Sequence, residues 1–162
     1  MADPRTAERR PVSYASFDDL ARDLDLLEAA HRAGTLRHTA NWTAGQNLEH
    51  CAILMECALD GFPSNAPWLF RKLARAMFLK AALSGKPAKA GYKLPKQASF
   101  LLPRDSVPFD EGAARVRRVI ERLKAGDRFT HPSPVFEKLT HDEWSRLQLG
   151  HCALHLSFLH PN

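Results

Sequence analysis

The sequence has no Asp or Glu between Gly61 and Pro103, although Lys and Arg recur throughout that stretch. A basic segment of this kind is able to bind nucleic acid, anionic lipid or an acidic small molecule. The alternative, which we favour, is that it forms the solvated face of an amphipathic helix. No nucleic-acid-binding motif accompanies it, so we predict no specific nucleic-acid partner. Its cations are Arg71, Lys72, Arg75, Lys80, Lys86, Lys89, Lys93 and Lys96.

Long apolar runs and cysteines are also scarce. No apolar stretch approaches the length that spans a bilayer, which predicts that the chain has no transmembrane segment. The Arg9-Arg10 pair near the N-terminus is not followed by the apolar run of a secretory signal. The three cysteines, Cys51, Cys57 and Cys152, are odd in number and fall in predicted helices, so we expect reduced, packed thiols in a cytoplasmic protein.

No segment has a convincing strand pattern, whereas five segments have the periodicity of helices, so we predict an all-α protein. Three helices begin with a Ser or Thr followed three residues later by an acidic or amide side chain, which is the pattern of a capping box. Glycine or proline marks most helix ends. The predicted helices are residues 17–33, 44–60, 67–84, 110–124 and 141–159.

The chain of 162 residues is long enough for one sizeable core, and we predict a single domain over residues 1–162. Residues 1–15 are expected to form a flexible or irregular N-terminal arm. Four of the helices suggest a four-helix bundle, and the helix at 67–84 then belongs to a long crossover over 61–109. With this crossover, the second and third bundle helices run the same way, and the helices at 44–60 and 141–159 are antiparallel.

Three histidines on apolar helix faces form the most informative pattern. His151 and His155 lie one helical turn apart on the same face, which is the spacing of an HxxxH metal site. His50 lies on the inward stripe of the helix at 44–60, and antiparallel packing brings it to the level of the other two. A buried imidazole without a partner costs about 1–3 kcal/mol, so three together favour a metal ion. The alternative is hydrogen bonding to helix carbonyls or water.

The pattern NWTAGQNLEHCAIL, followed far downstream by HxxxH, resembles the DinB-like (DinB/YfiT) superfamily of proposed metalloenzymes. More closely, KLTHDEWSRLQLGHCALHLSFL is similar to a branch of that superfamily whose function is not established. The resemblance covers most of the chain and is weakest over 61–109. It implies an up-down-down-up four-helix bundle in which His50, His151 and His155 bind a divalent metal.

Three neutral imidazoles suit zinc, nickel, iron or cobalt, and the donor type does not choose among them. Magnesium and calcium, which prefer oxygen donors, are disfavoured. With three protein ligands the remaining coordination positions are open to water, a thiol or a substrate, which is typical of catalytic rather than structural sites.

Several neighbours are candidates to support the ligands. Asn47 and Gln148 each lie three residues before a histidine on its own helix face. His31 and Glu28 lie near the end of the first helix. His31 is a candidate fourth ligand or acid/base group, but we favour its interpretation as a C-terminal histidine stabilised by the helix dipole. Glu49 is expected to face away from the site. The residues predicted near the entrance are Trp42, Phe100 and His160.

These observations lead to two functional hypotheses of different classes. The first is a metal-dependent enzyme, a hydrolase or thiol transferase, acting on a small-molecule substrate or thiol. The second is a non-catalytic, metal-stabilised bundle that binds an anionic partner or self-associates as a homodimer through the basic, apolar segment 67–96. No catalytic residue is predicted beyond the metal ligands and their supporting neighbours.

Overall fold

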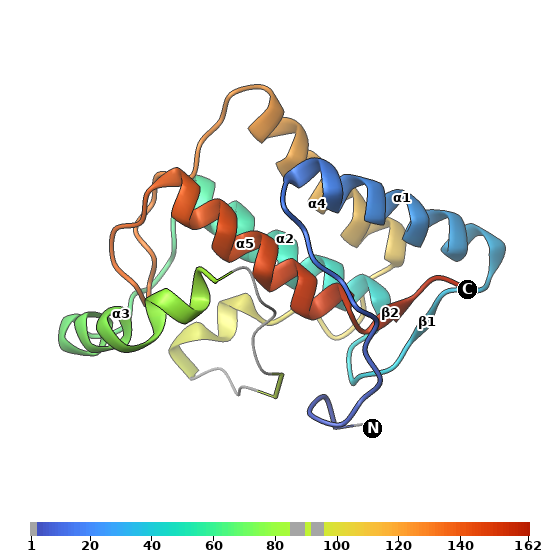
Figure 1. Ribbon diagram of the computed structural model, residues 1–162, viewed down its shortest axis with the longest axis horizontal. Coiled ribbons are helices and arrows are strands. Elements are labelled where there is room, and N and C mark those ends of the chain that lie inside the picture. The colour runs from blue at the N-terminus through green and yellow to red at the C-terminus, as the bar shows by residue number, and fades with distance from the viewer. Residues whose placement is uncertain (1–2, 85–89, 92–95) are drawn as a thin grey trace.

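Helices dominate the computed structural model, which describes residues 3–84, 90–91 and 96–162, and this confirms the prediction of a mainly α-helical protein (Figure 1). A short 3₁₀ helix, η1, spans Lys96–Leu101. The α-helices are α1 (Phe17–Ala33), α2 (Ala44–Asp60), α3 (Trp68–Ala82), α4 (Phe109–Lys124) and α5 (His141–Leu156).

Capping boxes begin α1, α2 and α5, as predicted. In each box the hydroxyl of Ser16, Thr43 or Thr140 accepts the backbone N–H three residues on, and that residue's side chain accepts the N–H of the cap. Gly34 ends α1 in the left-handed conformation, with φ of 71°. The predicted bounds of α1 and α2 match the structure because caps and apolar periodicity agree there.

Two predictions about the C-terminal end were wrong. The helix expected over 141–159 ends at Leu156, and the last residues form β2 (Leu159–His160), which pairs antiparallel with β1 (Arg37–His38). The protein therefore contains a small two-stranded sheet, although we predicted no strands. Its two strands are more than a hundred residues apart in the chain, so no local pattern marks the pairing.

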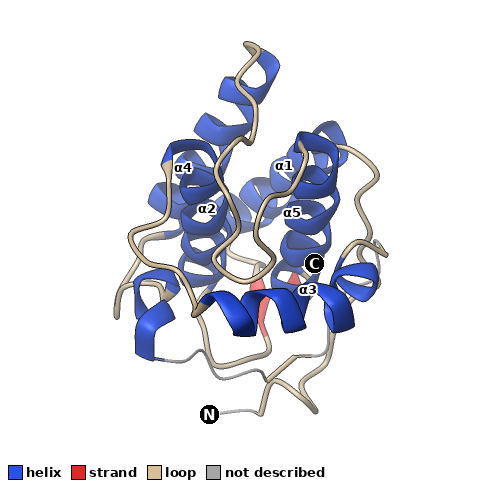
Figure 2. Cartoon of the chain, turned by 90° about the vertical axis from the view of Figure 1, so that its left-hand side faces the viewer, coloured by secondary structure: helices blue, strands red, loops and turns tan. Residues whose placement is uncertain are grey.

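The core lies where α2 packs between α4 and α5, with α1 against α4 and α5 (Figure 2). Two glycines permit the close approach of α2 and α4. A Cβ on Gly112 would lie 2.7 Å from the carbonyl oxygen of Gly45 and 2.9 Å from the Cβ of Leu48, which is closer than van der Waals contact allows.

The crossover differs from the rest of the molecule. Ala74 is the buried residue of α3, and the η1 turn interrupts the connection that we expected to be irregular from Lys86 to Pro108. Lys86, Lys89 and Lys93 lie outside the described residues. Among the described helices, none combines the length and apolar character needed to cross a membrane.

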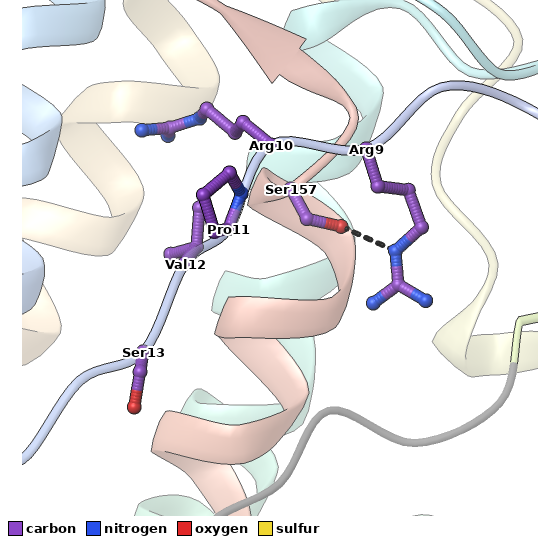
Figure 3. A pocket seen from close by; sticks show the side chains of 6 residues that line it. All are labelled: Arg9, Arg10, Pro11, Val12, Ser13 and Ser157. Atoms are coloured by element: carbon purple, nitrogen blue, oxygen red, sulfur yellow. Dashed lines mark hydrogen bonds between the residues drawn. The ribbon is translucent and has the colours of Figure 1, made fainter.

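The described residues before Ser16 form no helix or strand and run along the end of α5 (Figure 3). The backbone N–H of Arg10 donates to the Ser157 carbonyl at 2.8 Å, and its guanidinium forms a bidentate pair with Asp23. The side chain of Arg9 donates to the Ser157 hydroxyl across a surface hollow at 2.9 Å. These contacts tie the N-terminal arm to α1 and α5.

Candidate metal centre

The three histidines singled out in the sequence meet in space. His50 comes from the first half of α2, and His151 and His155 come from the last two turns of α5. One ring nitrogen from each lies within 4.8 Å of the others, and the Nε2 atoms of His50 and His151 are 3.2 Å apart. The cluster groups the residues that the sequence predicts as ligands.

A backbone contact orients the imidazole of His50. Its Nδ1 lies 2.6 Å from the carbonyl oxygen of Leu101, at the end of η1. Because a carbonyl only accepts, Nδ1 carries the proton and Nε2 keeps a free lone pair directed at His151. This is the arrangement by which an outer hydrogen bond orients a metal-binding histidine.

Burial favours the neutral form of all three rings. It lowers the pKa of His50, against the opposing effect of the Leu101 carbonyl. Burial lowers the pKa of His151 and His155 well below the usual value, and the neighbouring imidazoles lower it further. The cluster is therefore a set of uncharged nitrogen donors at neutral pH, which is the state that binds metals.

The donor set fits a divalent transition metal. Two nitrogens each about 2.0–2.1 Å from a tetrahedral zinc are roughly 3.3 Å apart, close to the 3.2 Å between the Nε2 atoms of His50 and His151. In the described part of the chain, the buried Nδ1 of His151 has no hydrogen-bond partner. A metal ion would bind the facing Nε2 atoms of His50 and His151.

An aromatic ring covers one side of the cluster. Trp42 stacks on His155, with ring centroids 5.5 Å apart and planes inclined by 20°, and it is tilted against His50 at 4.8 Å. The side-chain amide of Asn47 donates to the Trp42 carbonyl at 3.2 Å and to the Thr43 carbonyl at 3.0 Å. Asn47 thus holds the turn that carries Trp42 and has no direct contact with an imidazole.

Gln148 lies three residues before His151 and is fully buried. Its Nε2 donates to the Leu54 carbonyl on α2 at 3.1 Å. Its Oε1 has no hydrogen-bond partner among the described residues. The side chain therefore presents an unused acceptor beside α2, on the helix face that carries His151.

The structure places the other predicted residues away from the cluster or in packing roles. His31 stacks on Phe109 at 4.2 Å, and Glu28 pairs with Arg117, so both face α4. Phe100 packs against Phe62, with ring centroids 6.4 Å apart. His160 is buried in β2.

A buried ion network next to the cluster has no local signal in the sequence. Glu49 immediately precedes His50 on α2 but faces away from the histidines, and only 1% of it is exposed. It accepts from the backbone N–H of Arg104 at 2.8 Å and from the guanidinium groups of Arg104 and Arg115. Burial raises the pKa of Glu49, but these contacts outweigh it and the net pKa is lowered.

The Glu49 network has a consequence for the candidate site. Arg104 follows Leu101 by three residues, so the contact with Glu49 holds the chain segment whose carbonyl orients His50. The adjacent residues Glu49 and His50 of α2 thus both hydrogen-bond to the same short segment of the crossover, at Arg104 and Leu101. Sequence reasoning identified Glu49 only as a residue that faces away from the histidines.

The three cysteines carry free thiols. Cys51 and Cys152 are buried neighbours between α2 and α5, and burial, with the nearby Cys152, raises the pKa of the Cys51 thiol well above its usual value. Free thiols packed in the core, as at Cys51 and Cys152, fit the prediction of reduced, packed cysteines.

Fold and site together define a helical protein with a buried cluster of three histidines that is suited to hold a metal ion. The chain belongs to the family described as "Protein of unknown function (DUF1569)", which it matches over residues 6–162. No curated protein and no solved structure matches it.

Proposed function

We propose that the protein is a metal-dependent enzyme of the hydrolase or thiol-transferase type, with His50, His151 and His155 as ligands of a divalent transition metal. The convergence of three neutral imidazoles from two helices carries this proposal. A small-molecule substrate or thiol would approach on the side of His151 and His155, which keep some solvent exposure while His50 is buried.

The fold proposal is an up-down-down-up four-helix bundle of the DinB-like kind, formed by α1, α2, α4 and α5. Three sets of contacts support it. Gln148 contacts Leu54 and His151 contacts His50, as in antiparallel helices α5 and α2. Gly45 lies near Gly112, while Asp60 pairs with Arg122, as in parallel helices. Asp18 pairs with Lys124 and Glu28 with Arg117, as in antiparallel helices.

When bound, a divalent ion of this kind acts as a Lewis acid and lowers the pKa of a coordinated water or thiol. The protein's own groups have separate tasks. The Leu101 carbonyl fixes the tautomer of His50, and Trp42 shields one side of the rings from water. The free Oε1 of Gln148 is an acceptor for a donor group that enters the site.

Metal analysis of untagged protein tests the proposal. We expect close to one transition-metal ion per chain in the wild type and none in the double variant His151→Ala, His155→Ala. The variant His38→Ala is the matched control, because His38 lies exposed in β1, and it should keep the metal. A wild type that is empty and takes up no added zinc or nickel would overturn the proposal.

The second candidate is a non-catalytic, metal-stabilised bundle that binds an anionic partner or a second copy through segment 67–96. The exposed apolar side chains of α3 favour it. The two candidates differ in one measurable respect: an enzyme with bound metal turns over a substrate from a panel of esters, amides and thiol acceptors, and loses that activity in the double histidine variant.

A further inference from the structure

The helix α3 exposes an unusual number of large apolar side chains. Around much of its circumference it carries leucine, methionine and aromatic residues that are each at least half exposed. Single exposed apolar residues are common, but a contiguous group of this size marks an interaction site. The residues are Trp68 (62%), Leu69 (64%), Phe70 (53%), Leu73 (57%), Met77 (60%) and Phe78 (50%), and we call them the α3 face.

The rotation of α3 about its axis explains this exposure. Leu69, Leu73 and Met77 follow one another at intervals of four residues and so share one side of the helix. The inward side carries the buried Ala74 and Leu79, which packs against the core, together with Arg75. The guanidinium of Arg75 donates to the carbonyl oxygens of Phe136 and Lys138, at 2.7 and 2.8 Å. Arg75 therefore anchors α3 to the loop before α5 with its apolar side turned outward.

The position of α3 leaves this side free within the chain. Figure 1 shows α3 at one edge of the molecule, and Figure 2, seen from that edge, shows it lying crosswise in front of the helices of the core. Among the described residues, Ala74 is its one buried residue. A helix of 15 residues at about 1.5 Å per residue is roughly 22 Å long, so the face is an extended strip.

The charges on α3 indicate which kind of partner covers the α3 face. Lys72 and Lys80 are exposed on α3, and the sequence from Gly61 to Pro103 has no acidic residue to neutralise them. The ammonium of Lys72 lies 5.5 Å from the ring centre of Trp68, so cation and aromatic group stand together at the start of the helix. A second copy packed through this strip would bring like charges together, whereas an anionic surface would attract them.

We infer that α3 binds in the interface of an anionic lipid membrane. Helices that lie in a membrane interface combine Trp, Phe and Leu with Lys and Arg in this way, and they bury the apolar side to a depth of about 5–10 Å. The α3 face enters the boundary of headgroups and acyl chains, while Lys72 and Lys80 meet lipid phosphates. This inference does not depend on the metal centre.

Co-sedimentation with vesicles tests the inference. We expect the full-length protein to bind vesicles that contain phosphatidylglycerol and to bind phosphatidylcholine vesicles weakly, with binding that falls as salt rises. The double variant Leu73→Glu, Met77→Glu should reduce partitioning at least about 100-fold, since it removes two buried apolar groups and adds two anions. Lys72→Ala with Lys80→Ala should reduce it roughly 30-fold, at about fivefold for each cation.

The control is Leu26→Glu on α1, because Leu26 is 58% exposed, similar to Leu73, but lies outside α3. It should bind vesicles as the wild type does, and all variants should melt as the wild type does, since each changed side chain is exposed. Equal binding by wild type and the Leu73→Glu, Met77→Glu variant, or no binding to anionic vesicles, would overturn the inference. A dimer in sedimentation that the same variant dissociates, without vesicle binding, would assign the face to a second copy instead.

Discussion

The interior between α2 and α5 and the outer side of α3 both depart from the usual distribution of apolar side chains inside and polar side chains outside, in opposite directions. Three imidazoles lie inside the core, where apolar side chains are usual, and six large apolar side chains lie outside, where polar groups are usual. Each arrangement costs free energy in the isolated chain. Each arrangement suits a binding partner: by our proposal a metal ion in the interior and, by our inference, a lipid surface outside.

The two regions also differ in how firmly the protein holds them. The Leu101 carbonyl accepts a hydrogen bond from the His50 ring. Asn47, Gln148 and Glu49 hydrogen-bond to the chain segments next to the histidines. The α3 helix is attached mainly through Arg75 and the residues around it. A site for a small ion needs ordered ligands, whereas a surface that meets lipid needs only an exposed apolar strip.

The largest expected effect comes from removing an apolar side chain from each region. Leu48→Ala should lower the free energy of unfolding by about 2–5 kcal/mol, because Leu48 is completely buried and the change leaves a cavity. Leu69→Ala should change it by less than about 0.5 kcal/mol, because the side chain of Leu69 is 64% exposed. Urea unfolding of both variants measures the contrast. Similar losses for the two would mean that α3 packs against something in solution.

Metal addition should stabilise the interior and leave α3 unaffected. Zinc at about 100 times its Kd should raise the free energy of unfolding by about 2.7 kcal/mol, since it binds the folded state only. The variant His50→Gln should lose most of this gain, whereas Leu69→Ala should keep it. Thermal melts with and without zinc provide the measurement. An identical rise in Tm for His50→Gln would exclude His50 as a ligand.

Enlarging a side chain should also distinguish the core from the outer side of α3. Gly112→Ala should destabilise the protein, because overpacking against Gly45 and Leu48 costs about 1–3 kcal/mol and exceeds the helix-propensity gain of up to about 1 kcal/mol. Ala76→Leu on the exposed side of α3 should be almost neutral. Urea midpoints report both effects, and a neutral Gly112→Ala would show that α2 and α4 lie further apart than described.

A pH dependence of stability is also expected from the interior. The folded pKa values of His50, His151 and His155 lie below the usual 6.5, so below pH 6.5 the unfolded chain binds more protons than the folded chain. Stability of the metal-free protein is then full above pH 6.5 and falls as the pH drops below it, by up to about 1.4 kcal/mol per pH unit for each neutral imidazole.

Replacing one imidazole checks the origin of this slope. His151→Leu should make stability less dependent on pH between 6.5 and 5, as measured by urea unfolding at a series of pH values. Vesicle binding by α3 should change little over the same range, because the helix contains no histidine. An unchanged slope for His151→Leu would place the titrating groups elsewhere.

Local patterns in the sequence were sufficient to predict most helices and the shared face of His151 and His155, whereas bringing His50 to them required the predicted antiparallel packing of two helices. Capping boxes at Ser16, Thr43 and Thr140 and the spacing of apolar residues depend on neighbours within a few positions. His151 and His155 share a face simply because four residues make about one helical turn. The basic character of the stretch after Gly61 is likewise a property of composition.

Contacts between distant segments were decided only by the tertiary structure. The pairing of β1 with β2, the Leu101 carbonyl on His50 and the Arg104 contact with Glu49 each join residues more than fifty positions apart. The sequence also did not determine which side of α3 faces outward, because that depends on the hydrogen bonds of Arg75 to the distant loop before α5. Sequence periodicity defines which residues share a face, but long-range packing selects the partner that each face meets.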